Sequence, residues 1–478
     1  MLHLTLTVEK GIAERLVATV LGLLAVHGVT TPAEVPTLVR NGLERVCCVR
    51  GQLMTWELSE FGKHLCGGSG IGELMDDLGH ALASGGDEIR MLGGGQPAHI
   101  PVMDARWRQR LSEIVAKEGE LEHMLGNYEP PAGNLSFRAA VAGLFREKFG
   151  WQVGVENIGV TMGGQTAFFF LFNALAGRFH ADRQKKILLP LVPEYIGYAN
   201  QSLGTEIFAG VKPSIELIGD HEFKYHVDFD SMRVDEDIAA ICVSRPTNPT
   251  GNVLTDDEVS RLNTLAHELS VPLMIDNAYG APFPNAIFTD AKPVWNDGII
   301  LTLSLSKIGL PGTRTGIVVA REEIINALGS MTSIVGLANA NVGQAIVKPL
   351  IESGEILSLS NDVVQPFYKG QSKKALGWVD EFFDQGLPYR VHRSEGAFFL
   401  WLWFEDLPIT SRELYERLKS RGVLVVPGSY FFFGVDDPQW RHRDECLRVS
   451  FTMADEIVRD GFRIIADEVQ KAYQQAAA

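Results

Sequence analysis

The sequence has few cysteines and no hydrophobic run long enough for a membrane helix. Its scattered cysteines form neither a CxxC pair nor a Cys/His spacing typical of zinc, so no metal is expected. A small disulfide scaffold is excluded, and a reducing cytoplasm is the expected compartment. The longest apolar run, residues 16–26, is far shorter than the roughly 20 residues that span a bilayer. The five cysteines are Cys47, Cys48, Cys66, Cys242 and Cys446.

Basic residues are scarce relative to acidic ones. The chain has 43 Lys and Arg against 59 Asp and Glu, a formal net charge of -16. A polyanion would meet net repulsion, so nucleic acid is not an expected partner. The remaining composition, 46% hydrophobic and 21% charged over 478 residues, is that of a packed globular protein with two or three domains.

Residues 1–53 carry no recognisable chemistry. Their basic and acidic residues are nearly balanced, so the segment lacks the cationic face of a DNA-binding helix. Every motif described below lies after Met54. We therefore expect Met54 to be the natural start, with residues 1–53 an upstream extension of unknown role.

Residues 157–320 alternate short apolar runs with polar helical stretches, a rhythm that predicts βαβ units and a mainly parallel sheet. Thr255 to Glu258 form a capping box ahead of a helix that ends near Leu269. The expected strands are 157–161, 187–191, 239–244, 272–276, 299–304 and 316–320.

The C-terminal part predicts a second, α+β domain. A long helical region follows Val347, then strands near 389–392 and 397–404, a helix at 411–421 and a strand near 447–451. The fold class is therefore α/β, with a large, mainly parallel domain and a smaller α+β domain. The expected divisions are an extension at 1–53, an arm with part of the small domain at 54–102, the large domain at 103–346 and the small domain at 347–478.

Ligands of open α/β sheets bind beyond the carboxyl ends of the strands, where this sequence is unusually polar. After the first strand, Gly163, Gly164 and Gln165 lead into an apolar helix, and backbone N–H groups at a helix N-terminus suit a phosphate. A plain tight turn is the alternative. The second strand is followed by Tyr195, which brings an aromatic ring to the same edge.

Two further strand ends carry an amide and an acid. Asn248 lies between two prolines, which hold its backbone extended and suit it to aim one amide; a proline-rich turn is the alternative. Asp276 follows an apolar strand, with Tyr279 three residues later. A carboxylate there is costly without a cationic partner, although it could also cap the next helix.

The fifth strand ends in Ser304, Ser306 and Lys307, with Arg314 seven residues beyond the lysine. A lysine at a buried strand end is rarely structural, and partial desolvation makes it a Schiff-base nucleophile. Arg314 can grip a phosphate with its planar fork. Asn248, Asp276 and Lys307 are each about 30 residues apart, the length of one βαβ unit, so they are expected to converge on one edge.

These residues, in this order, resemble the fold-type-I pyridoxal-phosphate aminotransferases. The family motifs Asn-Pro-Thr-Gly, Asp-x-x-Tyr, Ser-x-Ser-Lys and a downstream Arg stand at 248–251, 276–279, 304–307 and 314. The resemblance extends from Met54 nearly to the C-terminus. Longer strings at 91–98, 194–198, 223–229 and 399–404 resemble the branch that transfers the amino group of L-valine to pyruvate.

The resemblance implies a role for each matching residue, with pyridoxal 5'-phosphate as cofactor. Lys307 binds the cofactor covalently, Asp276 keeps its ring nitrogen protonated, and Arg448 takes the substrate carboxylate. Tyr279 and Asn248 bond its phenolic oxygen, and Tyr195 stacks on the ring. The phosphate is held by Gly164, Gln165, Ser304, Ser306 and Arg314. Tyr128 reaches in from the neighbouring subunit of a homodimer, and Gly94, Asn248 and Ile71 contact the substrate.

The resemblance also implies a ping-pong exchange between an amino acid and a 2-oxo acid, giving 3-methyl-2-oxobutanoate and L-alanine from L-valine and pyruvate. Residues 54–89, where this family forms a lid, contain no arginine, which disfavours a dicarboxylic donor. Other donors, such as alanine, 2-aminobutyrate or an aromatic amino acid, remain open. So do a lyase, synthase or decarboxylase on the same cofactor, a catalytically inactive fold and a DNA-binding regulator built on it.

Overall fold

The computed structural model describes residues 48–49, 52–53, 56–67, 69–83, 89–180, 183–204 and 206–477. The chain divides into two compact units, Met1–Gly68 and Ser69–Ala478. In the first unit, β1 (Cys48–Val49) pairs antiparallel with β2 (Gln52–Leu53), and α3 (Glu60–Cys66) follows. The predictions for residues 1–53 fall almost entirely outside the described residues. All elements below belong to the second unit.

An eight-stranded sheet forms the centre of the second unit. Its apolar strands are buried, as expected for parallel strands covered on both faces. β13 runs antiparallel to its neighbours, β5 runs antiparallel to β6, and β7 (Phe208–Gly210) pairs with β6 beside β5. The prediction of a mainly parallel sheet is confirmed, and all six predicted strands are present. The strand order is β4 (Ile158–Thr161), β13 (Gly316–Val319), β12 (Ile299–Ser304), β11 (Leu273–Asp276), β10 (Ile238–Ser244), β6 (Gln184–Leu189) and β5 (Gly177–Arg178).

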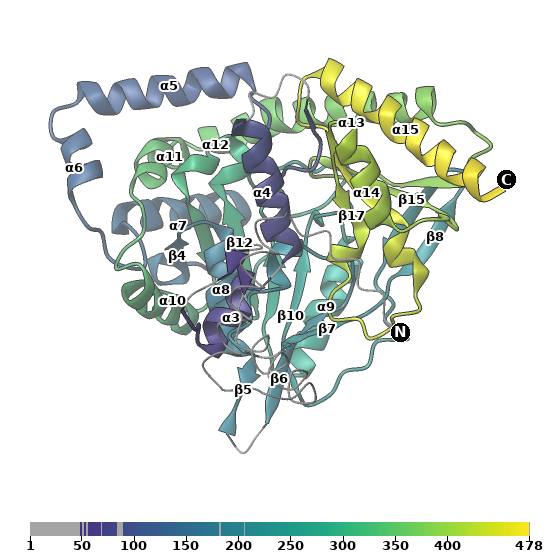
Figure 1. Ribbon diagram of the computed structural model, residues 1–478. Helices are drawn as coiled ribbons and strands as arrows, with labels where there is room; N and C mark the ends of the chain where they lie inside the picture. Colours follow the sequence, from purple (N-terminus) through teal and green to yellow (C-terminus); the bar gives the residue numbers. More distant parts are fainter. Residues whose placement is uncertain are drawn as a thin grey trace, which may run out of the picture. The chain divides into compact units, whose positions relative to one another are not determined.

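Helices cover this sheet. α8 (Gly164–Leu175) contacts β4, β6, β12 and β13, while α9 (Asp256–Glu268) contacts β10 and β11. The predicted capping box begins α9, since Thr255 and Glu258 exchange hydrogen bonds with each other's backbone. α10 (Glu322–Val335) and α7 (Leu135–Phe149) contact β4, and α11 (Val342–Glu352) contacts α7. α5 (Pro101–Ala116) and α6 (Glu120–Gly126), in blue, lie at the left of Figure 1.

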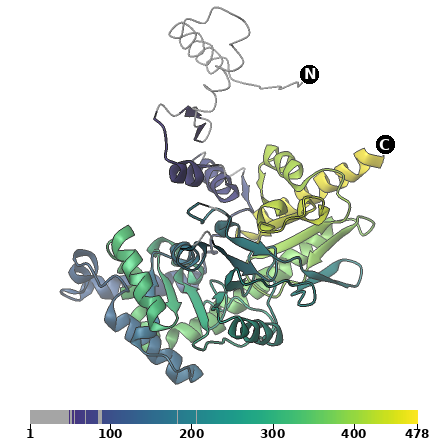
Figure 2. The ribbon, with the colours of Figure 1, turned by 90° about the horizontal axis from the view of Figure 1, so that it is seen from below.

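A second, six-stranded sheet lies on the side of α15 (Asp455–Ala477), the yellow helix of Figures 1 and 2. The predicted strands β14, β15 and β18 and the predicted helix α14 (Ser411–Ser420) are confirmed. β8 and β9 were not predicted; they come from the middle of the chain, and β9 pairs parallel with β14. The strand order is β17 (Val426–Pro427), β18 (Cys446–Ser450), β15 (Phe399–Phe404), β14 (Tyr389–His392), β9 (Glu222–His226) and β8 (Ser214–Ile218).

The predicted helical region after Val347 contains α11, α12 (Glu355–Leu359), a π-helical turn at Ser360–Val364 and α13 (Gln365–Phe382). A short parallel pair, β3 (Arg90–Met91) with β16 (Val423–Leu424), links the N-terminal part of this unit to its C-terminal part. α4 (Gly70–Ala83) is tied to α14 by ion pairs, including Glu73 with Arg412 at 2.6 Å and Asp77 with Lys419 at 2.8 Å. Within the described part of the chain, every helix is too short or too polar to cross a bilayer. The division into domains remains a prediction.

Candidate active site

A cavity of about 330 Å³ lies beyond the carboxyl ends of β4, β10, β11 and β12. Parallel strands bring their carboxyl ends to one edge of the sheet, which explains why residues far apart in sequence meet here. The cavity gathers most of the predicted site residues: Gly94, Gly164, Gln165, Tyr195, Asn248, Asp276, Tyr279, Ser304, Ser306, Lys307, Arg314 and Arg448.

Lys307 extends into the cavity from a 3-10 helix, η4 (Leu305–Ile308), directly after β12. Its Nζ donates to the carbonyl oxygen of Gly95 at 2.5 Å and lies 5.0 Å from the centre of the Tyr279 ring. Loss of hydration, helped by the charges of Arg448 and Arg314, lowers the pKa of Lys307 to about 8. A substantial fraction of this amine is therefore neutral near pH 8, and a neutral amine is a nucleophile and a base.

Asp276 is the last residue of β11 and presents its carboxylate to the same cavity. Oδ2 accepts a short hydrogen bond from the Tyr198 hydroxyl, and Oδ1 accepts one from the Ala278 N–H at 2.9 Å. Burial raises the pKa of Asp276, while these bonds oppose the rise. Among the described ion pairs none involves Asp276. A cationic ligand group is the partner that this carboxylate suits.

The opposite part of the cavity suits a phosphate. α8 begins at Gly164, and the first N–H groups of a helix have no carbonyl partner within it. Gly163 has φ +84°, and a Cβ there would collide with the Arg314 guanidinium. Among the described residues, Arg314 bonds only the carbonyl oxygens of Pro311 and Met162, both at 3.4 Å, so its charge is available to an anion. The hydroxyl-bearing residues Ser304 and Ser306 line the same cavity.

Arg448 on β18 is a buried cation that faces the cavity with 1% of its surface exposed. Its guanidinium lies 4.3 Å from the ring centre of Phe399 and 5.2 Å from that of Phe431. Nη1 donates to Asn248 Oδ1 and Nη2 to the Gly93 carbonyl, each at 2.6 Å, while Nε has no hydrogen-bond partner in the described part of the chain. Burial lowers the pKa of Arg448 to about 10, so it stays charged at neutral pH. A carboxylate is the natural ligand for it.

Two predicted aromatic residues lie on the cavity wall. Tyr279 packs edge-on against Phe398, with ring centres 4.9 Å apart, and burial raises its pKa. Tyr195 packs edge-on against Tyr198 at 5.2 Å, and burial raises its pKa as well. Both phenols therefore stay protonated at neutral pH and can donate hydrogen bonds.

Two predicted site residues are not placed in the cavity. Tyr128, in the segment after α6, has 83% of its surface exposed and does not line the cavity of its own chain. Its predicted role across a subunit interface stays a prediction. Ile71 lies on α4, but its side chain is outside the described residues.

Sequence reasoning missed several residues of the site. Tyr198 follows Tyr195 by three residues, so the 3-10 helix η3 (Ile196–Tyr198) places the two rings side by side; that spacing was the available signal. Glu194, next to Tyr195, has 1% of its surface exposed and bonds Ser244 at the cavity wall. Met75 of α4 was not missed: it lies in the 54–89 segment where the resemblance implies an apolar lid, and it lines the cavity.

Comparison with known proteins gives concordant matches. The model of the family described as aminotransferase class I and II matches residues 101–465. A valine–pyruvate aminotransferase of Escherichia coli is 45% identical over 423 residues, which cover 88% of this chain and 100% of that protein. The match therefore spans the whole length of that relative.

Solved structures agree with the sequence matches. A valine–pyruvate aminotransferase from Salmonella typhimurium superposes with a TM-score of 0.78 at 44% identity, covering 85% of this chain and 100% of that chain. An aspartate aminotransferase from Thermus thermophilus gives a TM-score of 0.68 at 20% identity, covering 87% of this chain and 100% of that one. The latter likeness concerns the fold alone.

Proposed function

The chain belongs to the class I and II aminotransferases, and from that premise we propose that it transfers the amino group of L-valine, or of a similar aliphatic amino acid, to pyruvate. The products are 3-methyl-2-oxobutanoate and L-alanine, formed in two half-reactions of a ping-pong cycle. The observation that carries the proposal is the convergence of Lys307, Asp276 and Arg448 on one cavity. Lys307 offers a nucleophilic amine. Asp276 offers a carboxylate that can pair with a cationic ring, and Arg448 offers a cation that can bind the substrate carboxylate.

The residues present fit pyridoxal 5'-phosphate, the cofactor of this family. When bound, this cofactor supplies an aldehyde for the amino group and a ring that accepts the electrons released at the substrate Cα. The phosphate would lie at the N-terminus of α8 with Arg314, Ser304 and Ser306. Gly163 has no side chain and so leaves room for the Arg314 guanidinium; we call this arrangement the phosphate cradle. The buried Asp276 carboxylate, which has no ion-pair partner among the described residues, would pair with the protonated ring nitrogen.

Arg448 would orient the amino acid substrate. Its Nη1 and Nη2 each hold one neutral oxygen acceptor, and a carboxylate would bring the negative charge that this buried cation lacks. The Phe399 and Phe431 rings beside the guanidinium keep its plane fixed. The substrate α-carbon is then held toward Lys307, which lines the same cavity.

Lys307 would move the proton of the reaction. In its neutral form its amine takes the proton from the substrate Cα, and in its charged form it returns that proton. A pKa of about 8 leaves both forms populated near neutral pH, which is the condition for one group to serve as base and acid. The cavity wall around Nζ, including Gly95 and Tyr279, limits where the amine can move.

The cavity favours an uncharged substrate side chain. Its described lining residues include three cations, Lys307, Arg314 and Arg448, and each already has a role in the proposal. None is left for the second carboxylate of aspartate or glutamate. Met75, Ile196 and Pro246 contribute apolar surface to the wall. Since one methylene contributes only about 1–3 kcal/mol to discrimination, alanine and 2-aminobutyrate are expected to react too.

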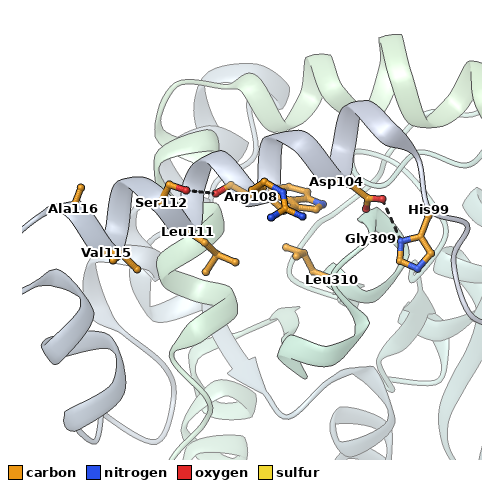
Figure 3. A pocket seen from close by; sticks show the side chains of 10 residues that line it. His99, Asp104, Arg108, Leu111, Ser112, Val115, Ala116, Gly309 and Leu310 are labelled. Carbon is orange, nitrogen blue, oxygen red and sulfur yellow. Dashed lines mark hydrogen bonds and ion pairs between the residues drawn. The ribbon is translucent and has the colours of Figure 1, made fainter.

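A homodimer in the cytoplasm is part of the proposal. α5 and the residues after Lys307 line a groove of about 820 Å³, drawn in Figure 3, whose wall includes Leu111, Val115 and Leu310. Further exposed apolar side chains on the neighbouring segment include Leu125 and Tyr128. Exposed apolar surface of this kind suits a second copy of the chain, which would bring Tyr128 to the partner's site.

Steady-state kinetics with a panel of donors test the proposal. With pyruvate as acceptor, L-valine is expected to yield L-alanine and 3-methyl-2-oxobutanoate in equal amounts, with the parallel double-reciprocal lines of a ping-pong mechanism. L-aspartate and L-glutamate should have far lower kcat/KM values. A preference for a dicarboxylic or aromatic donor over L-valine would leave the transaminase intact and overturn the assigned substrate.

A further inference from the structure

Glu194 is a carboxyl group enclosed behind the wall of the active site. It follows the second parallel strand, β6, and has 1% of its surface exposed. Oε1 accepts from the Ser244 N–H at 2.7 Å, and Oε2 accepts from the Tyr195 N–H at 3.0 Å. Oε2 also lies 2.6 Å from the Ser244 hydroxyl oxygen. Ser244 and Tyr195 both line the cavity, whereas Glu194 itself does not.

The position of Glu194 connects three parts of the site. Ser244 on β10 is paired with Asp276 on β11. Ser244 therefore links the Glu194 carboxyl to Asp276, the acid that the proposal pairs with the cofactor ring nitrogen. The Glu194 N–H donates to the carbonyl oxygen of Phe431 at 2.9 Å, and Phe431 packs on Arg448. Glu194 therefore holds two backbone segments of the site in place: Ser244, which lies beside Asp276, and Phe431, which packs on Arg448.

No cation neutralises Glu194. All three hydrogen bonds of its carboxyl are to uncharged groups, and no ion pair among the described residues includes it. The titratable groups that face it are Asp276 on β11, Tyr195 and Tyr198 around η3, and Cys242 on β10, and all of these are neutral or anionic. Burial without a positive partner raises the pKa of Glu194 to about 8, with the Asp276 charge adding to the rise.

We propose that Glu194 is a positioning residue that works in its protonated, neutral form. Its carboxyl holds Tyr195 and Ser244 in place; in the neutral form Oε2–H would donate to the Ser244 hydroxyl oxygen 2.6 Å away, reversing the bond that an ionised carboxylate would accept. A neutral Glu194 leaves Asp276 as the only anionic carboxylate at the ring site, so the full attraction for a protonated ring nitrogen comes from one defined position. This inference rests on the proposed function for the role of Asp276.

The test compares the E194Q, E194A and D276N holoenzymes by the pH dependence of the visible absorption band of the bound cofactor, without substrate. Asp276 holds the ring proton, so D276N removes the carboxylate and that proton together and is expected to shift the spectral pKa by about one unit or more. E194Q should leave it within about 0.3 unit of the wild type, because no charge is removed. A shift in E194Q as large as that in D276N would overturn the proposal, since the substitution would then have removed a charge from Glu194.

Measurements of kcat distinguish a positioning role for Glu194 from a carboxyl group that is only buried. Glutamine can keep both bonds to Ser244 and loses the one to Tyr195, so E194Q should retain kcat within about fivefold, whereas E194A should lose about tenfold or more. Wild-type activity in E194A, or equal losses in both variants, would overturn the proposal.

Infrared spectroscopy gives a readout that needs neither substrate nor cofactor. At neutral pH the wild-type protein should show the C=O stretching band of a buried carboxylic acid that is missing in E194Q. Its absence in the wild type would refute the protonated form, even if E194A does not fold. A protein that shows this band but no visible cofactor band would instead count against the proposed function.

Discussion

Arg448 donates a hydrogen bond from Nη1 to Oδ1 of Asn248 across 2.6 Å, joining two residues that are 200 positions apart. Arg448 belongs to the six-stranded sheet, whereas Asn248 follows a strand of the eight-stranded sheet. Both residues are buried and both line the cavity. The proposed carboxylate site therefore depends on how the two sheets meet, and Asn248 presents the guanidinium to the substrate.

Replacing Arg448 should impair substrate binding more than folding. R448Q removes the proposed carboxylate partner, and kcat/KM for L-valine should fall about a hundredfold or more, mainly through KM. R448K should recover little, because an ammonium lacks the planar fork. The matched control is R441K, at an exposed arginine outside the cavity, which should keep wild-type kinetics. An R448K enzyme with an unchanged KM would contradict the assignment.

Two adjacent glycines give a matched pair for the phosphate cradle. A Cβ at Gly163, where φ is +84°, would meet the Arg314 guanidinium, while nothing lies within 4 Å of a Cβ at Gly164. G163A should therefore weaken pyridoxal phosphate binding by about tenfold or more and cost about 1–3 kcal/mol of stability. G164A should change the free energy of unfolding much less. Thermal unfolding measures the stability effect and fluorescence titration measures cofactor binding by G163A; an equal loss of stability in the two variants would contradict the cradle.

The apoenzyme should show an unusually reactive Lys307. Only the neutral amine reacts with an acylating reagent, and a pKa lowered to about 8 populates that form as the pH rises through 8. Its labelling rate, followed by peptide mapping, should reach half its maximum near pH 8 and then level off. Exposed Lys117 serves as the comparison within the same sample. A rate at Lys307 that keeps climbing toward the ordinary lysine range, about 10.4, would contradict this prediction.

Tyr198 should tune the acid limb of the pH profile. Its hydroxyl donates to Asp276 and lowers the pKa of that carboxyl, so Y198F raises the pKa. The carboxylate is then lost at a higher pH, and the acid limb of kcat/KM should move upward. Activity should fall by several-fold on the acid side and less at alkaline pH. Y389F, at a buried tyrosine outside the cavity, is the control; an unmoved acid limb in Y198F would contradict the relationship.

Much of the fold could be predicted because its signals are local. The strands of the central sheet are short buried runs of apolar residues, and the helix after Thr255 has a capping box that the structure retains. The hairpin of β8 and β9 was missed because its place depends on pairing with β14, more than 160 residues later in the chain. The side chains of β8 are mostly exposed or half-buried, so no apolar run marks that strand.

The candidate site could be predicted where its residues lie directly after strands, as with Asp276 and Lys307, because strand ends converge by topology. The supporting bonds could not. Tyr198 and Glu194 act through contacts with Asp276 and Ser244, and such contacts between distant segments leave no spacing in the sequence. For Tyr128 the sequence made a prediction that a single chain does not test, because the predicted role of this residue concerns a second copy of the chain.

The most direct test of the central claim is the absorption spectrum of the purified protein with pyridoxal phosphate, before and after L-valine and then after pyruvate. Lys307 should bind the cofactor and give a visible band, L-valine should convert it to a near-ultraviolet band, and pyruvate should restore it. This cycle would show both half-reactions on one enzyme. A visible band that L-valine leaves unchanged would contradict the assigned donor, and the absence of any visible band would contradict the proposed role of Lys307.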